Sequence, residues 1–250
     1  MLDFADRIAL VTGGGSGIGA ACARALAARG AIVIVGDIRP AAAETVAREI
    51  ESAGGQAVAL RIDTTNPGDS MAAVGMAVER FGRLDHAVNN AGIGGNLEVT
   101  VAQGDLDNWR QTIDVNLNGV FYGLHYQLAH MTERGRGSVV NLASILGLRG
   151  QEKSAAYVAS KHGVVGLTKT AALEAAKHNV RVNAVCPGYI DTPMLATAPQ
   201  DVRSKLGALH PIGRLGQAEE VAELIVFLLS DKASLITGSC HLADGGFSAR

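Results

Sequence analysis

The chain has 250 residues, of which 48% are hydrophobic and 18% are charged, and its formal net charge is −2. This composition excludes a disordered chain, and the length predicts one large core in a single domain over residues 1–250. The weak net charge gives no electrostatic reason to expect nucleic acid or an anionic membrane as a partner.

Apolar runs and cysteines suggest the compartment. No run reaches the ~20 apolar residues that span a bilayer, and the N-terminus lacks the basic region of a signal peptide. Cys22, Cys186 and Cys240 are far apart and odd in number, so we expect reduced thiols in a cytoplasmic protein. The seven histidines form no HExxH motif, and we expect no metal site.

Apolar, β-branched runs alternate with alanine-rich stretches of helical period from end to end. The strands are expected at 7–13, 31–37, 56–63, 84–92, 137–144, 181–188 and 238–246. Four of the helices between and after them are expected at 17–30, 40–55, 67–82 and 217–231. Nearly continuous apolar strands are typical of a parallel sheet buried on both faces. The alternation predicts an α/β, single-domain, doubly wound parallel sheet (Rossmann fold) with helices on both faces.

Residues 189–216 interrupt this alternation. They contain three prolines and little periodic pattern. A long irregular segment in a compact domain is usually a lid or a binding loop, so we predict a substrate loop here, with a solvated connection as the alternative.

The first strand leads into TGGGSGIGA (12–20), which opens a helix. Glycines let the backbone turn tightly and approach a pyrophosphate, which the helix N-terminus also attracts. Asp37 ends the second strand, where a carboxylate accepts hydrogen bonds from ribose hydroxyls and repels a 2′-phosphate. These residues predict NAD as the cofactor, although Arg39 offers a cation to the phosphate of NADP.

Tyr157 and Lys161 lie in the stretch SAAYVASKHG (154–163). Their four-residue spacing is about one helical turn, so both side chains should project from the same face of a helix. A phenol beside an ammonium is either part of an exposed helix face or a base whose proton is easily removed. The rest of the chain decides between these interpretations.

Several motifs together resemble the short-chain dehydrogenase/reductase family over the whole chain. They are Gly13-x3-Gly17-x-Gly19, NNAG (89–92), the serine of NLAS and YVASK, in the order of the family. The resemblance implies that Tyr157 exchanges a proton with the substrate oxygen, which Ser144 hydrogen-bonds. It also implies that Lys161 holds the nicotinamide ribose and that Asn116 keeps a water in a proton relay to Lys161. A free phenol has a pKa of about 10, and we expect Lys161 and the nicotinamide to lower that of Tyr157.

The resemblance also implies a set of cofactor-binding residues at the carboxyl ends of the strands. Asp63 and Thr64 would meet the adenine, and the PGYIDTP stretch (187–193) would border the nicotinamide amide. The full set is Gly13, Ser16, Gly17, Ile18, Gly19, Asp37, Asp63, Thr64, Asn90, Gly92, Tyr157, Lys161, Pro187, Gly188, Ile190 and Thr192.

Substrate contacts are expected from 94–97, 145–151, Tyr189 and 191–213. Their composition is mainly apolar, and Arg149 is expected at a solvated rim. DVNLNGVFYGLHY, YVASKHGVVGLTKTAALE and HPIGRLGQAEEVAELIVFLLSD are similar to bacterial cyclohexanol-type secondary-alcohol dehydrogenases and to dehydrogenases of chlorinated cyclohexadiene diols. This similarity implies NAD-dependent interconversion of an apolar secondary alcohol, cyclic in those relatives, and its ketone.

Two alternatives remain open. A 3-oxoacyl-(acyl carrier protein) reductase shares the motif set, but it would usually prefer NADP, which Asp37 disfavours. A non-catalytic dinucleotide-sensing protein would tend to lose the tyrosine or the serine, and this chain has both. Stretches 119–128 and 164–176 carry more apolar surface than a sheet face needs, and relatives pair such helices, so we expect a symmetric homo-oligomer, a tetramer.

Overall fold

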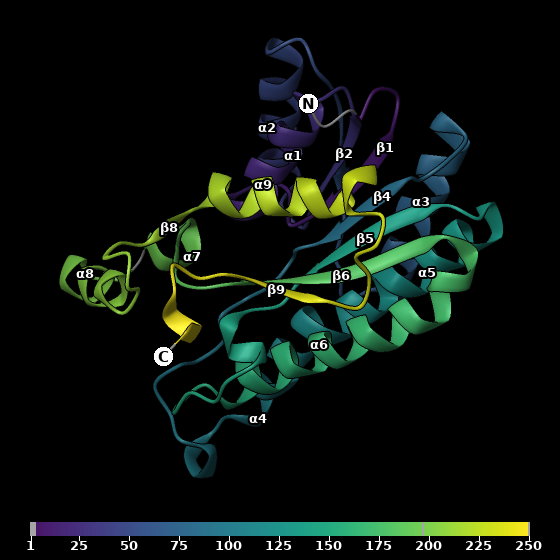
Figure 1. Cartoon of the computed structure of the whole chain (residues 1–250). Coiled ribbons are helices and arrows are strands. Elements are labelled where there is room, and N and C mark those ends of the chain that lie inside the picture. Colours follow the sequence, from purple (N-terminus) through teal and green to yellow (C-terminus); the bar gives the residue numbers. More distant parts are fainter. Residues whose placement is uncertain (1–3, 197, 250) are drawn as a thin grey trace.

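A computed structural model describes residues 4–196 and 198–249 of the chain (Figure 1). Its centre is a seven-stranded parallel sheet in the order β3-β2-β1-β4-β5-β6-β9. The strands are β1 Ile8–Thr12, β2 Ile32–Asp37, β3 Gln56–Arg61, β4 His86–Asn89, β5 Gly137–Leu142, β6 Val180–Pro187 and β9 Cys240–Ala243. Each lies within one residue of its predicted range, and the doubly wound Rossmann fold is confirmed.

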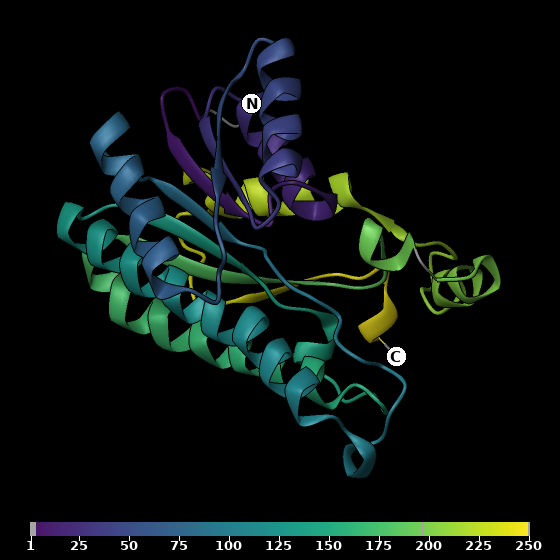
Figure 2. The ribbon, with the colours of Figure 1, turned by 180° about the vertical axis from the view of Figure 1, so that it is seen from behind.

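Helices cover both faces of this sheet (Figures 1 and 2). One face carries α1 Gly17–Ala27, α2 Pro40–Ser52 and α9 Ala218–Leu229, whose apolar side chains form one core cluster with the strands. The other carries α3 Pro67–Phe81, α5 Gly119–Arg134 and α6 Ala155–Ala175, which form a second cluster. The five inner strands are therefore buried on both faces, which explains the lack of polar alternation in their sequences, whereas the edge strands β3 and β9 are only partly buried.

Helix α3 shows how local sequence sets the bounds of an element. The Asn66 side chain accepts a hydrogen bond from Gly68 N at 2.9 Å, and Pro67 occupies the first helical position. At the other end Gly82 has a φ of +76°, the left-handed conformation that ends many helices. The chain then turns back toward β4.

The expected irregular segment 189–216 is more ordered than its sequence indicates. It contains β7 Ile190–Asp191, α7 Pro193–Ala196 and α8 Gln200–Ala208, and β7 pairs in parallel with β8 Gly216–Gln217. Helix α8 stands away from the sheet (Figures 1 and 2), and Gly207 is its only buried residue. An exposed helix needs no apolar stripe, so hydrophobic periodicity could not reveal it.

Several side chains have environments that bear on the expectations above. Cys22 and Cys186 are buried, Cys240 is partly buried, and all three are free thiols. Trp109, on α4 Leu106–Ile113, remains 42% exposed. Within the described ranges, no helix combines the length and the apolar character that a membrane crossing requires.

Candidate active site

The carboxyl ends of the parallel strands bring the predicted motifs to one edge of the sheet. Thr12 is in register with Gly36 of β2 and with Asn89 of β4, which in turn pairs with Asn141 of β5. The strand order reverses between β1 and β4. In open α/β sheets, such a reversal forms the crevice in which ligands bind.

The glycine-rich turn between β1 and α1 requires its glycines. Gly13 and Gly17 have positive φ values of 62° and 52°, which other residues rarely adopt. A Cβ on Gly19 would lie 2.2 Å from the carbonyl oxygen of Gly13. Asn90 joins this turn to the end of β4, because its Nδ2 donates to Thr12 O at 2.9 Å and to Gly13 O at 3.1 Å. The N-terminus of α1 is thus held open beside the reversal point.

Asp37 is buried beside the same turn. Its Oδ2 accepts a hydrogen bond from Gly15 N at 3.0 Å, and its Oδ1 accepts one from Arg39 N at 3.0 Å. The Arg39 guanidinium lies across the carboxylate, with Nε 3.4 Å from Asp37 Oδ1 and Nη2 3.2 Å from Ser16 Oγ. The acidic residue and the basic residue from which the sequence predicts the choice between NAD and NADP therefore lie together.

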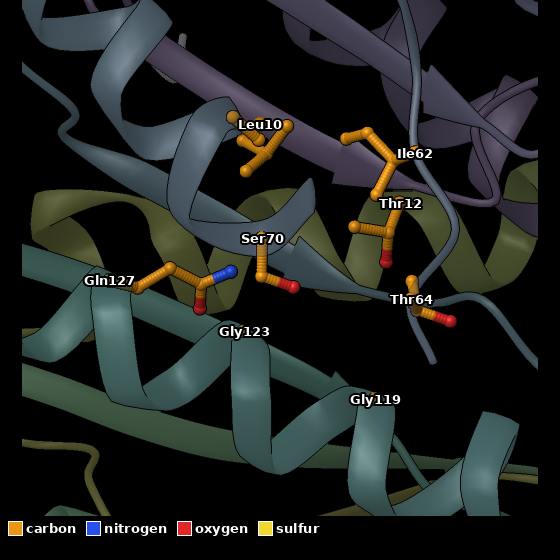
Figure 3. A pocket seen from close by; sticks show the side chains of 9 residues that line it. Leu10, Thr12, Ile62, Thr64, Ser70, Gly119, Gly123 and Gln127 are labelled. Atoms are coloured by element: carbon orange, nitrogen blue, oxygen red, sulfur yellow. The ribbon is translucent and has the colours of Figure 1, made fainter. Parts of the chain in front are cut away.

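The residues expected at the adenine lie after β3. Asp63 Oδ1 accepts hydrogen bonds from the backbone N and the Oγ1 of Thr65, at 3.0 and 2.7 Å. Thr64 packs against Gly119, where a Cβ would lie 2.9 Å from that of Thr64. Thr64 also lines a cavity of about 10 Å³ between β1, α3 and α5 (Figure 3). That volume has room for one water and no more.

Ser144 and Tyr157 meet at the end of β5. The hydroxyl of Ser144 accepts a hydrogen bond from Leu146 N at 3.1 Å, and the Ser144 side chain lies close enough to the Tyr157 phenol to act on its pKa. Tyr157 and Lys161 project from the same face of α6, and Lys161 Nζ lies 5.7 Å from the centre of the tyrosine ring. The geometry expected from their spacing is therefore present.

Lys161 is almost fully buried, with 4% of its surface exposed. Its ammonium donates a hydrogen bond to Leu142 O at 2.7 Å, and burial lowers its pKa to about 8. The expectation that the pKa of Tyr157 is lowered is wrong for the protein's own groups. Burial raises that pKa, and the hydrogen bond from Ser144 opposes the rise without overcoming it.

Asn116 lies in a π-helical turn, Asp114–Asn118, between α4 and α5. Turns of this kind are frequent at functional sites. Its Oδ1 accepts from Ile93 N at 2.8 Å, and its Nδ2 donates to Ile93 O at 2.9 Å and to Ser160 Oγ at 3.3 Å. A Cβ on Gly92 would lie 3.2 Å from Asn116 Oδ1 and 3.6 Å from Lys161 Nζ. Three predicted residues from three segments therefore meet here.

A chain of buried polar side chains lies deeper between the same elements, and sequence reasoning did not find it. Asn89 and Gln127 exchange two amide hydrogen bonds, at 3.0 and 2.8 Å. Asn89 also donates to Asn141 Oδ1 at 2.9 Å, and Asn141 donates to Thr168 Oγ1 at 3.0 Å. These four residues tie β4, β5, α5 and α6 together, the elements that carry or adjoin the predicted catalytic residues.

The segment after β6 returns to the glycine-rich turn. Pro187 ends β6 and Ile190 begins β7, while a Cβ on Gly17 would lie 3.3 Å from Thr192. A Cβ on Gly188 would lie 2.5 Å from Nε2 of His210, a residue that sequence reasoning did not single out. His210 is buried: its Nε2 accepts from Tyr189 N at 3.0 Å, and its Nδ1 pairs with Arg214 O at 2.7 Å. It fixes both ends of the 189–216 segment.

Arg149, which was expected at a solvated rim, is half-buried between the exposed Leu148 and Gly150. Its guanidinium donates to Ser248 O and lies 5.8 Å from the centre of the Phe247 ring. Phe247 packs edge-on against Tyr189, with ring centres 5.8 Å apart. The C-terminal residues therefore border this side of the site. Among the described residues, no group of three or more His, Cys, Asp or Glu side chains is placed to hold a metal ion.

Comparisons with known proteins agree with this geometry. Residues 13–248 match the family model described as enoyl-(acyl carrier protein) reductase. The chain is 49% identical to a cyclohexanol dehydrogenase of Acinetobacter sp. (strain SE19), over 99% of this chain and 97% of that protein. It is 46% identical to a cis-4-hydroxycyclohexanecarboxylate dehydrogenase of Sinomonas cyclohexanicum, over 98% of each.

Among solved structures, levodione reductase superposes with a TM-score of 0.95 at 38% identity, covering 98% of this chain and 99% of that one. Matches in both sequence and structure thus extend over nearly the whole chain and include every element that carries the predicted site. The chain therefore belongs to the short-chain dehydrogenase/reductase family, whose dehydrogenases use a nicotinamide dinucleotide.

Proposed function

We propose that this protein is an NAD-dependent dehydrogenase that interconverts an apolar, cyclic secondary alcohol and its ketone. The observation that carries the proposal is the placement of the Tyr157 phenol near the Ser144 side chain, with the buried ammonium of Lys161 5.7 Å from the tyrosine ring. Two hydroxyls that meet at a strand end are suited to bind one substrate oxygen from two sides. The cyclic substrates named for the relatives supply the substrate class.

In this mechanism each residue has one task. The residues assigned below would hold a nicotinamide dinucleotide, which would supply the hydride acceptor for alcohol oxidation and the hydride donor for ketone reduction. Ser144 donates a hydrogen bond to the substrate oxygen and stabilises the charge that develops there. Tyr157 Oη takes the hydroxyl proton during oxidation and returns it during reduction. In the cofactor complex, the Lys161 ammonium together with the nicotinamide would favour the phenolate against the effect of burial. Asn116 holds the segment after β4 against α6 and is proposed to keep a water in the relay to Lys161.

The cofactor-binding residues proposed from the sequence fit a dinucleotide. At Gly13, Gly17 and Gly19 the turn has no room for a side chain or needs a positive φ. The backbone can therefore approach a pyrophosphate, to which the N-terminal N–H groups of α1 would donate hydrogen bonds. Asp37 is proposed to bind the adenosine ribose, and Lys161 the nicotinamide ribose. The remaining contacts are assigned to Gly13, Ser16, Gly17, Ile18, Gly19, Asp63, Thr64, Asn90, Gly92, Tyr157, Pro187, Gly188, Ile190 and Thr192.

An apolar substrate suits the side chains around the two hydroxyls. Ile145 and Leu146 are buried next to Ser144, and the exposed Leu148 and Met194 add apolar surface at the 145–151 loop and the 189–216 lid. Two neighbouring cations have partners within the chain: Arg149 binds Ser248, and Arg203 Nη2 lies 2.6 Å from Asp191 Oδ1.

The alternatives are weaker for specific reasons. A 3-oxoacyl-(acyl carrier protein) reductase that uses NADP must place a 2′-phosphate beside Asp37. A dinucleotide-sensing protein needs no proton-transfer group, whereas this chain keeps Asn116, Ser144, Tyr157 and Lys161. A cytoplasmic location stays a prediction, which rests on the three free thiols.

A panel of alcohols and ketones, followed at 340 nm with NAD(H) and NADP(H), tests the proposed function. We expect cyclohexanol and related cyclic secondary alcohols to be oxidised with NAD at a higher kcat/KM than primary or open-chain alcohols. A 3-oxoacyl thioester serves as the matched rival substrate with NADPH. Activity confined to the thioester would contradict the proposal and support the reductase.

We also propose a symmetric homotetramer. Phe121 on α5 and Leu173 on α6 are 50% and 83% exposed in the isolated chain, and pairing of these helices about a two-fold axis would bury both. Light scattering should give about four times the 25.8 kDa chain mass. Phe121→Glu or Leu173→Glu should lower that mass. Leu235→Glu is the control and should not, because Leu235 is exposed but lies outside both helices. A monomeric wild type at micromolar concentration refutes the tetramer.

A further inference from the structure

A polar pair bridges two loops at the substrate side of the site. The Tyr189 hydroxyl donates a hydrogen bond to Gln151 Oε1 at 3.1 Å. Tyr189 follows β6, whereas Gln151 lies in the connection between β5 and α6. The bond thus joins two loops that leave the carboxyl edge of the sheet, on either side of the segment that carries Tyr157.

Both side chains are held in place by further contacts. Gln151 Nε2 donates to Ser154 Oγ at 3.2 Å, and Ser154 is buried at the N-terminus of α6, three residues before Tyr157. The backbone N of Tyr189 binds His210, and the Tyr189 ring centre lies 5.8 Å from those of His210 and Phe247. The pair is therefore preorganised, which reduces the entropy lost when a ligand binds.

The pair also lies near the reacting hydroxyls, because Ser154, which binds Gln151, is the N-cap of the helix whose first turn carries Tyr157. Tyr189 and Tyr157 interact electrostatically, an interaction that contributes to the raised pKa of Tyr157. The 145–151 loop, which follows Ser144 and ends at Gln151, supplies the buried apolar side chains of Ile145 and Leu146. We infer that a ring bound with one oxygen at Tyr157 can present a second oxygen to the two loops that Gln151 and Tyr189 join.

Hydrogen-bonding capacity remains on this pair. A glutamine amide nitrogen has two hydrogens, and one of those on Gln151 is directed to Ser154. The Tyr189 oxygen donates its hydrogen to Gln151 and keeps a lone pair. One donor and one acceptor suit a hydroxyl or a keto oxygen. A carboxylate would need a cation, and Arg149 is engaged with Ser248 and Phe247.

We propose that Gln151 and Tyr189 form a second polar subsite that binds a neutral oxygen of the substrate, remote from the reacting carbon. The preferred substrates are then six-membered rings with two oxygen functions, such as a diol, a hydroxyketone or a diketone. The proposal rests on the proposed function, because it extends the substrate class of the same site.

The test compares cyclohexane-1,3-diol and cyclohexane-1,4-diol with the 3- and 4-methylcyclohexanols, in which a methyl group replaces the second hydroxyl. For the wild type with NAD, we expect kcat/KM to favour at least one diol over its methyl counterpart by about tenfold. The reason is that a methyl group would leave the hydrogen-bonding groups of Gln151 and Tyr189 without a partner. Gln151→Leu and Tyr189→Phe should reduce that ratio to about one. Glu152→Gln, exposed in the same loop, should keep the wild-type ratio.

Two results overturn the subsite: a wild type that favours both methyl compounds, or a diol preference that both variants retain. If no cyclic alcohol is oxidised, the proposed function is wrong. The subsite can still be tested by measuring the Tm of the NAD complex with and without a diol. A diol that raises the Tm of the NAD complex in the wild type and not in Gln151→Leu supports it. An equal shift in both proteins, or none, refutes it.

Discussion

Replacing Tyr157 by Phe should lower kcat by about two to four powers of ten, the usual contribution of general acid–base catalysis. The ring keeps its packing on α6, while the hydroxyl that meets Ser144 is lost. NAD affinity, measured by fluorescence titration, should change far less than kcat, because Tyr157 is one of many proposed cofactor contacts and its hydroxyl acts on the substrate oxygen. Steady-state kinetics with a saturating cyclic alcohol measures the loss.

Tyr126→Phe is the matched control, since it removes a phenol from α5, away from this site, and should leave kcat unchanged. The pH dependence gives a second check. Burial raises the pKa of Tyr157, so alcohol oxidation should accelerate as pH rises and the phenol loses its proton. Ketone reduction, which needs the protonated phenol, should slow over the same range. A Tyr157→Phe enzyme with near-normal turnover would rule out this mechanism.

The fold and much of the site were accessible from sequence because their signals are local. A buried parallel strand such as IALVT in β1 is apolar throughout, and a glycine that must adopt a positive φ, such as Gly13, marks its turn. Tyr157 and Lys161 share a helix face by spacing alone. Parallel pairing then brings separate strand ends to one edge, so placing motifs at strand ends was enough to assemble them.

Other features depend on contacts that no local pattern records. Arg149 meets Ser248 across 99 residues of sequence, and Asn89 meets Gln127 across 38. His210 is buried, but no periodic pattern in the surrounding sequence marks it as the residue that fixes the 189–216 segment. The pKa of Tyr157 was misjudged for the same reason, because the depth of its burial is a property of the folded chain, whereas its nearness to Lys161 is visible in the sequence.

The wild type should prefer NAD to NADP by roughly a hundredfold or more in kcat/KM. Asp37 can accept charge-assisted hydrogen bonds from the ribose 2′-hydroxyl, which contribute about 1.5–3 kcal/mol. Against NADP the same carboxylate faces a phosphate with almost two negative charges. Because each 1.4 kcal/mol is about a factor of ten, loss of the hydrogen bonds and added repulsion together give that ratio. Initial rates with both cofactors at one alcohol concentration measure it.

Three variants separate the acidic residue from the basic one. Asp37→Ala should reduce the preference mainly by weakening NAD, and Ile38→Arg should begin to recruit NADP, because Ile38 is exposed next to Asp37. Arg39→Ala is the decisive arm, since the Arg39 guanidinium already spans Asp37 and Ser16. It should leave NAD preferred. If the wild type used NADP equally well and Arg39→Ala abolished that use, Arg39 would be binding the 2′-phosphate, and the acyl carrier protein reductase would become the better assignment.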